Sequence, residues 1–223
     1  LLSEPPQENL AAPLAQLIHH TDERVRIAAM EAVAGRGHKE LLFDLLGIIN
    51  EGTRRSRVAA IRAVVALDPK RAAGALAPYL RAEDPGLLAA AIEALITLRG
   101  TVPSNPAVSV LESLLDKAHQ ASPAERRETA KLLGRLGDGR YAGHLCTYLN
   151  DPEPSVRRLA AQSCKRVYRE TFVPHLLRML ADREIRHAAR DALAAYGDRV
   201  VEILEDWLND RDRPLAVRIR VPR

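Results

Sequence analysis

The sequence predicts an all-α protein, a right-handed α-solenoid of about seven helix pairs. Three observations predict this fold. A pattern recurs roughly every 30 residues, each repeat holds two amphipathic segments, and aromatic residues make up only 4% of the 223 residues. Alanine and leucine supply the apolar surface instead. That composition suits close helix packing better than a sheet, where β-branched and aromatic residues fit.

The repeat is clearest in the second helix of each pair. Its anchor positions recur at intervals of 31, 31, 39, 30 and 29, at Val25, Ser56, Leu87, Arg126, Val156 and Ile185. The residue after the anchor is arginine in five of six repeats: Arg26, Arg57, Arg127, Arg157 and Arg186. The residue four after the anchor is always alanine: Ala29, Ala60, Ala91, Ala130, Ala160 and Ala189. Positions four apart share one face of a helix, so we expect these alanines to form a buried seam.

Start and stop signals frame these second helices. Asp22, Asp84 and Asp182 precede their anchors by three residues, where a carboxylate can cap free N–H groups. Ser122 and Glu125 form a capping box. Glycines follow several of the helices, at Gly35, Gly37, Gly100, Gly137 and Gly197. The first helices are expected at residues 10–20, 40–50, 72–81, 108–118, 140–150, 172–181 and 200–209.

The third interval between anchor positions, 39 residues, is the longest and indicates an insertion between the third and fourth repeats. Glycine and proline are frequent in this stretch, so we expect a surface loop over residues 100–107, with a hinge as the alternative. We expect residues 1–223 to form a single repeat domain. The abrupt start at Leu1 and the short seventh repeat indicate a fragment of a longer protein.

Three segments carry a resemblance to a known family. Residues 21–33 (Thr-Asp-Glu-Arg-Val-Arg-Ile-Ala-Ala-Met-Glu-Ala-Val), 151–161 and 182–193 resemble HEAT repeats of the short bacterial type, and the likeness covers nearly the whole chain. The resemblance implies a helical solenoid. It also implies a binding function, because HEAT arrays bind proteins most often and nucleic acids in some cases.

A second resemblance concerns the C-terminal end. Residues 195–201 (Ala-Tyr-Gly-Asp-Arg-Val-Val), 207–210 and 214–223 resemble a segment of bacterial membrane proteins in which an ADP/ATP-carrier-like transporter is joined to cytosolic HEAT repeats. The resemblance implies that the chain is the soluble part of a membrane-tethered bacterial protein. It covers only this short segment and includes none of the transporter's own residues.

Composition and motifs narrow the function classes. The net charge of +4 is small, and the sequence has no signal peptide and no apolar run long enough to span a membrane. We therefore expect a cytoplasmic domain, either free or tethered to the inner membrane through the rest of the protein. No nucleophile, phosphate-loop or zinc-protease motif is found, so neither an enzyme nor a cofactor is expected. The pairs His144/Cys146 and His19/His20 fall short of a metal site.

The candidate binding residues form a basic stripe on the fifth second helix. Arg158, Gln162, Lys165 and Arg169 are separated by 4, 3 and 4 positions and therefore share one face of this helix, and Lys131, Arg135 and His187 extend the stripe onto neighbouring helices. This stripe predicts a groove for an acidic protein segment, from another protein or from another domain of the same chain. A phospholigand or nucleic acid is the alternative, disfavoured because Tyr168 is the only aromatic residue nearby. An ordinary solvated surface stays equally open.

The recurring arginines have a structural interpretation. A guanidinium matches the geometry of a carboxylate, so Arg26, Arg57, Arg127, Arg157 and Arg186 are expected to reach loop carboxylates at Asp22, Asp84, Asp151 and Asp182. A ladder of phosphate ligands is the alternative. The function that these observations favour is a protein–protein interaction scaffold or regulatory module.

Overall fold

The computed structural model describes residues 10–98, 106–212 and 214–220, and within these ranges it contains helices and turns but no strand. The chain divides into two compact units, Leu1–Leu111 and Glu112–Arg223. Each unit is a stack of helix pairs, in which we name the first helix A and the second helix B. The all-α prediction is confirmed. That residues 1–223 act as one domain stays a prediction.

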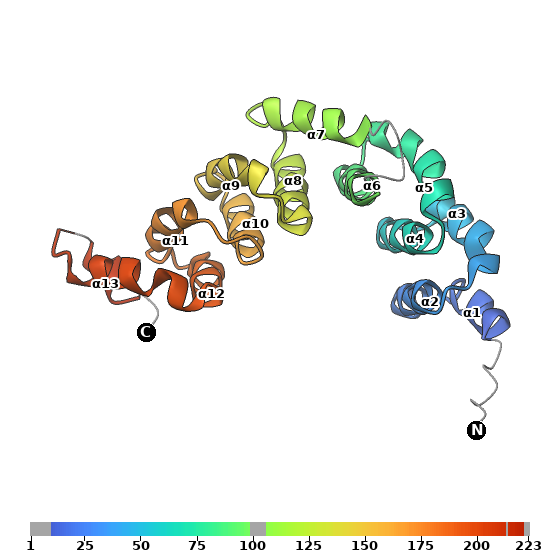
Figure 1. The fold of residues 1–223 in the computed structure, drawn as a ribbon, viewed down its shortest axis with the longest axis horizontal. Coiled ribbons are helices and arrows are strands. Elements are labelled where there is room, and N and C mark those ends of the chain that lie inside the picture. Colours follow the sequence, from blue (N-terminus) through green and yellow to red (C-terminus); the bar gives the residue numbers. More distant parts are fainter. Residues whose placement is uncertain (1–9, 99–105, 213, 221–223) are drawn as a thin grey trace, which may run out of the picture. The chain divides into compact units, whose positions relative to one another are not determined.

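The N-terminal unit contains three complete pairs. Its elements are α1 (Ala11–Leu17), α2 (Glu23–Arg36), η1 (Lys39–Leu41), α3 (Leu42–Glu51), α4 (Arg54–Leu67), α5 (Pro69–Leu76), η2 (Ala77–Arg81) and α6 (Pro85–Thr97). The B helices α2, α4 and α6 pack side by side, and the A helices α1, α3 and α5 cover one side of them (Figure 1).

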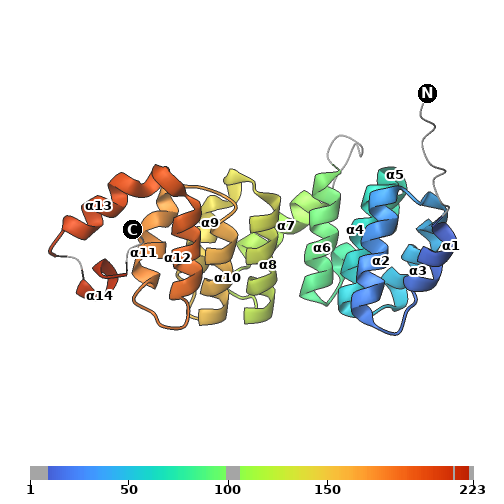
Figure 2. The ribbon, with the colours of Figure 1, turned by 90° about the horizontal axis from the view of Figure 1, so that it is seen from below.

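The C-terminal unit repeats the arrangement. Its elements are α8 (Pro123–Leu136), η3 (Gly139–Tyr141), α9 (Ala142–Leu149), α10 (Pro154–Cys164), η4 (Glu170–Phe172), α11 (Val173–Met179), α12 (Arg186–Ala195), η5 (Gly197–Val200), α13 (Val201–Asn209) and α14 (Leu215–Arg218). The helix α7 (Pro106–Asp116) contains the boundary between the units. The B helices α8, α10 and α12 lie side by side (Figure 2).

Local chemistry explains where the B helices begin and end. The Asp22 carboxylate accepts a hydrogen bond from Arg24 N at 2.8 Å, and the Asp84 carboxylate accepts one from Leu87 N at 2.8 Å. Ser122 and Glu125 form the predicted capping box. Gly37 and Gly137 end α2 and α8 with φ of 73° and 64°, a left-handed conformation that favours glycine.

Two of the expected helix boundaries differ from the structure. Gly35 lies inside α2, which ends one residue later, at Arg36. The Asp182 carboxylate accepts from Glu184 N at 2.9 Å, but that bond closes a turn, and α12 begins only at Arg186. In both places the residue that predicted the helix boundary, Gly35 or Asp182, lies a few positions away from the observed boundary.

The alanine seam is confirmed. All six alanines, Ala29, Ala60, Ala91, Ala130, Ala160 and Ala189, are buried, with at most 4% of their surface exposed. A methyl side chain lets neighbouring B helices approach closely, and larger apolar residues such as Ile61, Leu132 and Leu193 fill the space beside it. Buried apolar residues lie on the A helices as well, for example Leu45 and Leu176, so the core of each unit is the layer between its A and B helices.

The predicted insertion at residues 100–107 falls mostly outside the described residues. Only Pro106 and Ala107 are described, and they begin α7. In the ranges covered by the structure, no helix is both long enough and apolar enough to cross a membrane.

Candidate binding groove

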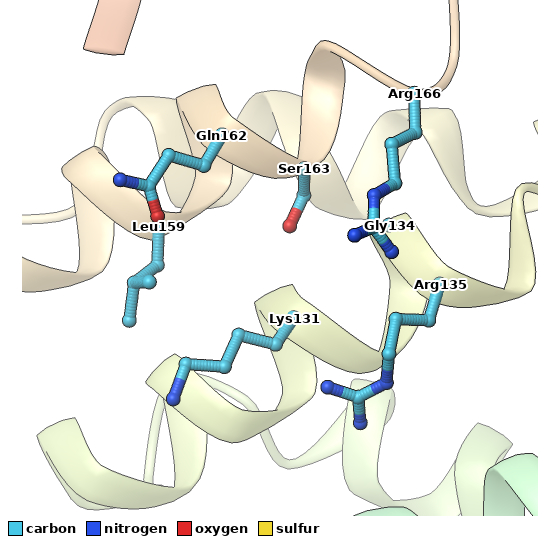
Figure 3. Close-up of a pocket in the computed structure, with 7 residues that line it drawn as sticks. All are labelled: Lys131, Gly134, Arg135, Leu159, Gln162, Ser163 and Arg166. Carbon is cyan, nitrogen blue, oxygen red and sulfur yellow. The ribbon is translucent and has the colours of Figure 1, made fainter. Parts of the chain in front are cut away.

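A polar hollow lies between the B helices α8 and α10 of the C-terminal unit (Figure 3). Its volume is about 230 Å³. Seven residues line it: Lys131, Gly134, Arg135, Leu159, Gln162, Ser163 and Arg166. Three of the seven are cationic, so the hollow has a positive potential that favours an anionic group.

Helical spacing brings these side chains together. Lys131, Gly134 and Arg135 are three and four positions apart on α8 and therefore share one face. Leu159, Gln162 and Ser163 have the same spacing on α10. Arg166 follows in the turn after α10, and its guanidinium points toward α8 (Figure 3).

The floor of the hollow depends on Gly134. A Cβ atom built at this position would lie 2.4 Å from the Cβ of Ser163, which is closer than real side chains approach. The absence of a side chain therefore allows α8 to come close to α10 and leaves the Ser163 hydroxyl uncovered by α8. Larger residues on either side, Lys131 and Arg135, then form the rim on α8.

The structure brings together only part of the predicted basic stripe. Lys131, Arg135 and Gln162 line the hollow, whereas Arg158 and Lys165 are exposed but do not line it. Lys131 also pairs with Glu128 at 2.9 Å. His187 is exposed on α12, where its Nδ1 lies 3.0 Å from an Arg190 guanidinium nitrogen.

The placement of Arg169 on this stripe was wrong. The helix α10 ends at Cys164, so the helical spacing that aligned Arg158 with Arg169 does not extend to residue 169. Arg169 has an extended conformation before η4, donates to the Tyr168 carbonyl at 2.8 Å and lies over Gly139. Arg166, which the sequence interpretation omitted, takes the place at the groove.

A ladder of arginines and aspartates joins successive repeats in the C-terminal unit. Arg126 donates to both carboxylate oxygens of Asp151, at 2.7 and 3.1 Å, and both side chains are largely buried. Arg157 donates to Asp182 at 3.1 Å and to the carbonyls of Asp151 and Pro152. The hydrogen bond to Asp151 raises the pKa of Arg126, against the opposing effect of burial. Each arginine thus connects its own turn to the next repeat.

The fourth repeat differs from the predicted register. Arg126, rather than Arg127, reaches Asp151, and Arg127 instead donates to the Ser155 hydroxyl at 3.2 Å. The reason is the cap: Ser122 begins α8, and Arg126 is four positions after it, as Arg157 is four positions after Glu153. Alignment on alanine shifted this repeat by one position, because Thr129 and Ala130 are both buried.

In the N-terminal unit the corresponding arginines find other acceptors. Arg26 donates to the carbonyls of His20 and Thr21, at 2.7 and 2.9 Å, and to the Ser56 hydroxyl at 3.3 Å. Arg57 donates to the Ile49 carbonyl at 2.7 Å, and its guanidinium lies 5.9 Å from the centre of the Tyr79 ring.

Two further pairings differ from the expected ladder. Asp84 pairs with Arg54 at 3.2 Å, so the carboxylate is met by the first residue of α4 and not by an arginine at the repeating position. Arg186 approaches the Asp182 carbonyl, at 3.4 Å, and not its carboxylate. Each of these contacts still lies at the turn between an A and a B helix.

Buried titratable groups elsewhere have a structural explanation. Burial raises the pKa of Tyr148 to about 12, and burial also raises the pKa of the Cys164 thiol and of the Tyr196 phenol. The Tyr196 hydroxyl donates to the Cys164 carbonyl at 2.9 Å. A thiol with a raised pKa is a poor nucleophile, so Cys164 behaves as a small core residue. Among the described side chains, no three potential ligands gather to form a metal site.

Comparison with known proteins identifies the repeat. A family model of HEAT repeats matches residues 111–194, which include α8, α10 and most of α12. Residues 111–194 are HEAT repeats. The match to the HEAT model ends before residues 195–223, where the resemblance to transporter-linked proteins was seen. A search of curated proteins found no match.

Proposed function

We propose that this chain is a non-catalytic interaction module that binds an acidic protein segment in the groove between α8 and α10. HEAT repeats generally mediate protein–protein interaction, and an all-α HEAT fold is typically a scaffold. The observation that supports this site is the convergence of Lys131, Arg135 and Arg166 on one hollow. The segment belongs either to a separate protein or to another part of the same polypeptide.

The groove favours a protein segment over a nucleic acid. None of its lining residues is aromatic, so the groove offers no surface on which a base could stack. Leu159 contributes an apolar contact beside the cations, which a side chain of a peptide can use. A peptide in this groove would therefore combine charge pairing with a small apolar contact.

The test uses short fluorescein-labelled peptides of equal length with acidic, neutral or basic composition, measured by fluorescence anisotropy. We expect the acidic peptides alone to bind. The double variant Arg135→Glu/Arg166→Glu should weaken their binding by roughly a hundredfold, because two charge pairs become repulsive. Circular dichroism should show unchanged helicity.

The matched control is Arg183→Glu, an exposed arginine of the same unit that does not line the groove. This variant should bind acidic peptides like the wild type. Equal losses in both variants would show that net charge alone drives binding and would refute the site. Tighter binding of a random single-stranded oligonucleotide, with a steep salt dependence, would refute the protein assignment.

A further inference from the structure

The hollow between α8 and α10 has a hydroxyl group on its wall. Ser163 is 6% exposed, and what remains exposed opens into the hollow. The hydroxyl lines the hollow and points toward α8 (Figure 3). A hydroxyl that faces an open hollow can donate a hydrogen bond to water or to a ligand. Ser163 is therefore available as one donor of a binding site.

The charges around this hydroxyl indicate an anion of more than one charge. Lys131, Arg135 and Arg166 contribute three positive charges, and none of the seven lining residues is acidic. Glu128 pairs with Lys131 at 2.9 Å and offsets its charge, so the charge of a ligand is matched mainly by the guanidinium groups of Arg135 and Arg166. A carboxylate carries one negative charge, whereas a phosphate monoester carries about 1.5 to 2 at neutral pH and has three acceptor oxygens. The lining therefore matches a phosphate better than a single carboxylate.

The donors match a phosphate in kind as well as in charge. A guanidinium offers two parallel N–H donors that fit two phosphate oxygens, and a serine hydroxyl can donate to a third. Arg135 and Arg166 approach the hollow from α8 and from the turn after α10, and Ser163 lies on its α10 wall (Figure 3). Donors from two sides can therefore surround a single tetrahedral group.

The size of the hollow restricts the ligand to one small group. Its volume of about 230 Å³ is below the range of roughly 300 Å³ and above that is common for small-molecule sites. A phosphate group fits this volume, while a nucleobase with its sugar does not fit together with the phosphate. The lining also lacks an aromatic side chain for stacking.

We propose that this hollow is a phosphate-binding subsite that recognises a phosphorylated side chain on the partner segment, with Arg135, Arg166 and the Ser163 hydroxyl as its ligands and Lys131 at its rim. The proposal rests on the proposed function and narrows it from an acidic segment to a phosphorylated one. Gly134 keeps the site open, because any side chain there would meet Ser163.

The first experiment tests the subsite with inorganic phosphate alone. Side-chain Nε resonances of arginine in ¹⁵N-labelled protein are followed during a phosphate titration at constant ionic strength. We expect saturable shifts at Arg135 and Arg166, a roughly tenfold weaker affinity in Arg166→Gln and a roughly threefold weaker affinity in Ser163→Ala. Shifts that are identical in chloride, or unchanged in Arg166→Gln, would overturn the proposal.

Two control variants accompany this titration. Arg183→Gln and Ser113→Ala change the same residue types at exposed positions outside the hollow, and both should bind phosphate like the wild type. The melting temperature of each variant, followed by circular dichroism, checks that it is folded.

The second experiment separates the sources of phosphate. Degenerate peptide pools with a central phosphoserine, glutamate or serine are compared by anisotropy, together with a random oligonucleotide. We expect the phosphoserine pool to bind roughly tenfold more tightly than the glutamate pool. Equal binding of these two pools would overturn the phosphate subsite and leave the proposed function intact. Preference for the oligonucleotide would overturn both.

Discussion

The two units of this protein share one seam but differ in how their turns are joined. In both, small alanines bring the B helices together. In the C-terminal unit, Arg126 and Arg157 each bind a carboxylate of the following repeat. In the N-terminal unit, Arg26 binds carbonyls and a serine hydroxyl instead, and Leu88 stands where the third arginine would be.

The alanine seam and the arginine–aspartate ladder differ in how they are distributed over the two units. The alanine seam is present in both units. The N-terminal unit forms stacked helix pairs although Arg26 and Arg57, at the repeating position, bind no aspartate, and although its Arg54–Asp84 pair is exposed. The HEAT family model matches residues 111–194, where the arginine–aspartate ladder is present.

The largest expected effect comes from breaking the ladder in the C-terminal unit. Asp151→Ala leaves the Arg126 guanidinium, 14% exposed, without its carboxylate, and should lower the free energy of unfolding by about 3 kcal/mol. Ser56→Ala removes only a hydroxyl acceptor of Arg26 and should cost about 1 kcal/mol.

Urea unfolding measures both changes, with Trp207 fluorescence reporting on the C-terminal unit and circular dichroism on the whole chain. Asp191→Ala, an exposed aspartate on α12, is the control and should have no effect. Similar losses for Asp151→Ala and Ser56→Ala would show that the two kinds of turn are energetically equivalent.

The next effect tests the feature that the units share. Ala60→Leu in α4 and Ala160→Leu in α10 both place a larger side chain at a fully buried seam position. Each should cost about 2 kcal/mol through overpacking. Ala195→Leu, at an exposed position, should cost little. If only one of the two seam variants is destabilised, the seam is not equivalent in the two units.

A smaller effect appears at alkaline pH. Burial raises the pKa of Tyr148 to about 12, above the usual value of about 10. The neutral phenol is thus favoured by folding, so its contribution is present below pH 10 and is lost as the pH rises toward 12. Tyr148→Phe removes the phenol hydroxyl and with it this titration. The variant should show a smaller loss of stability between pH 10 and 11.5 than the wild type does, and parallel pH profiles would contradict this.

The smallest effect concerns the capping box of α8. Hydrogen bonds from Ser122 hold the pKa of Glu125 below its usual value. Its contribution is therefore present above about pH 4.3 and is lost as the pH falls through the lower, folded pKa. Glu125→Gln should cost about 0.5 kcal/mol at pH 7, since the group is largely exposed and screened. The difference from the wild type should vanish near pH 3, and a constant difference would exclude an ionic origin.

The helix pairs were predictable because their signals are local. Caps such as Asp22 and Ser122, and seam residues such as Ala160, act within one or two helical turns of their own position. Arg166 was missed because the predicted stripe follows Arg158, Lys165 and Arg169, whereas the hollow lies beside the neighbouring face of α10 with Leu159 and Ser163. The hollow itself requires the register of two helices, since Gly134 and Ser163 become significant only when they face each other.

The links between repeats also have a direction, which bears on how such an array can be lengthened. Arg126 precedes Asp151 by 25 residues, and Arg157 precedes Asp182 by the same number. Each repeat therefore supplies an arginine that binds the following repeat and an aspartate that is bound by the preceding repeat. A second copy of residues 127–157, placed directly after Arg157, would put a new aspartate at this same separation after Arg157 and a new arginine at this same separation before Asp182. Such a duplication adds a whole repeat and leaves no charged partner of the ladder unmatched, so the array can grow by internal copying without a redesigned junction.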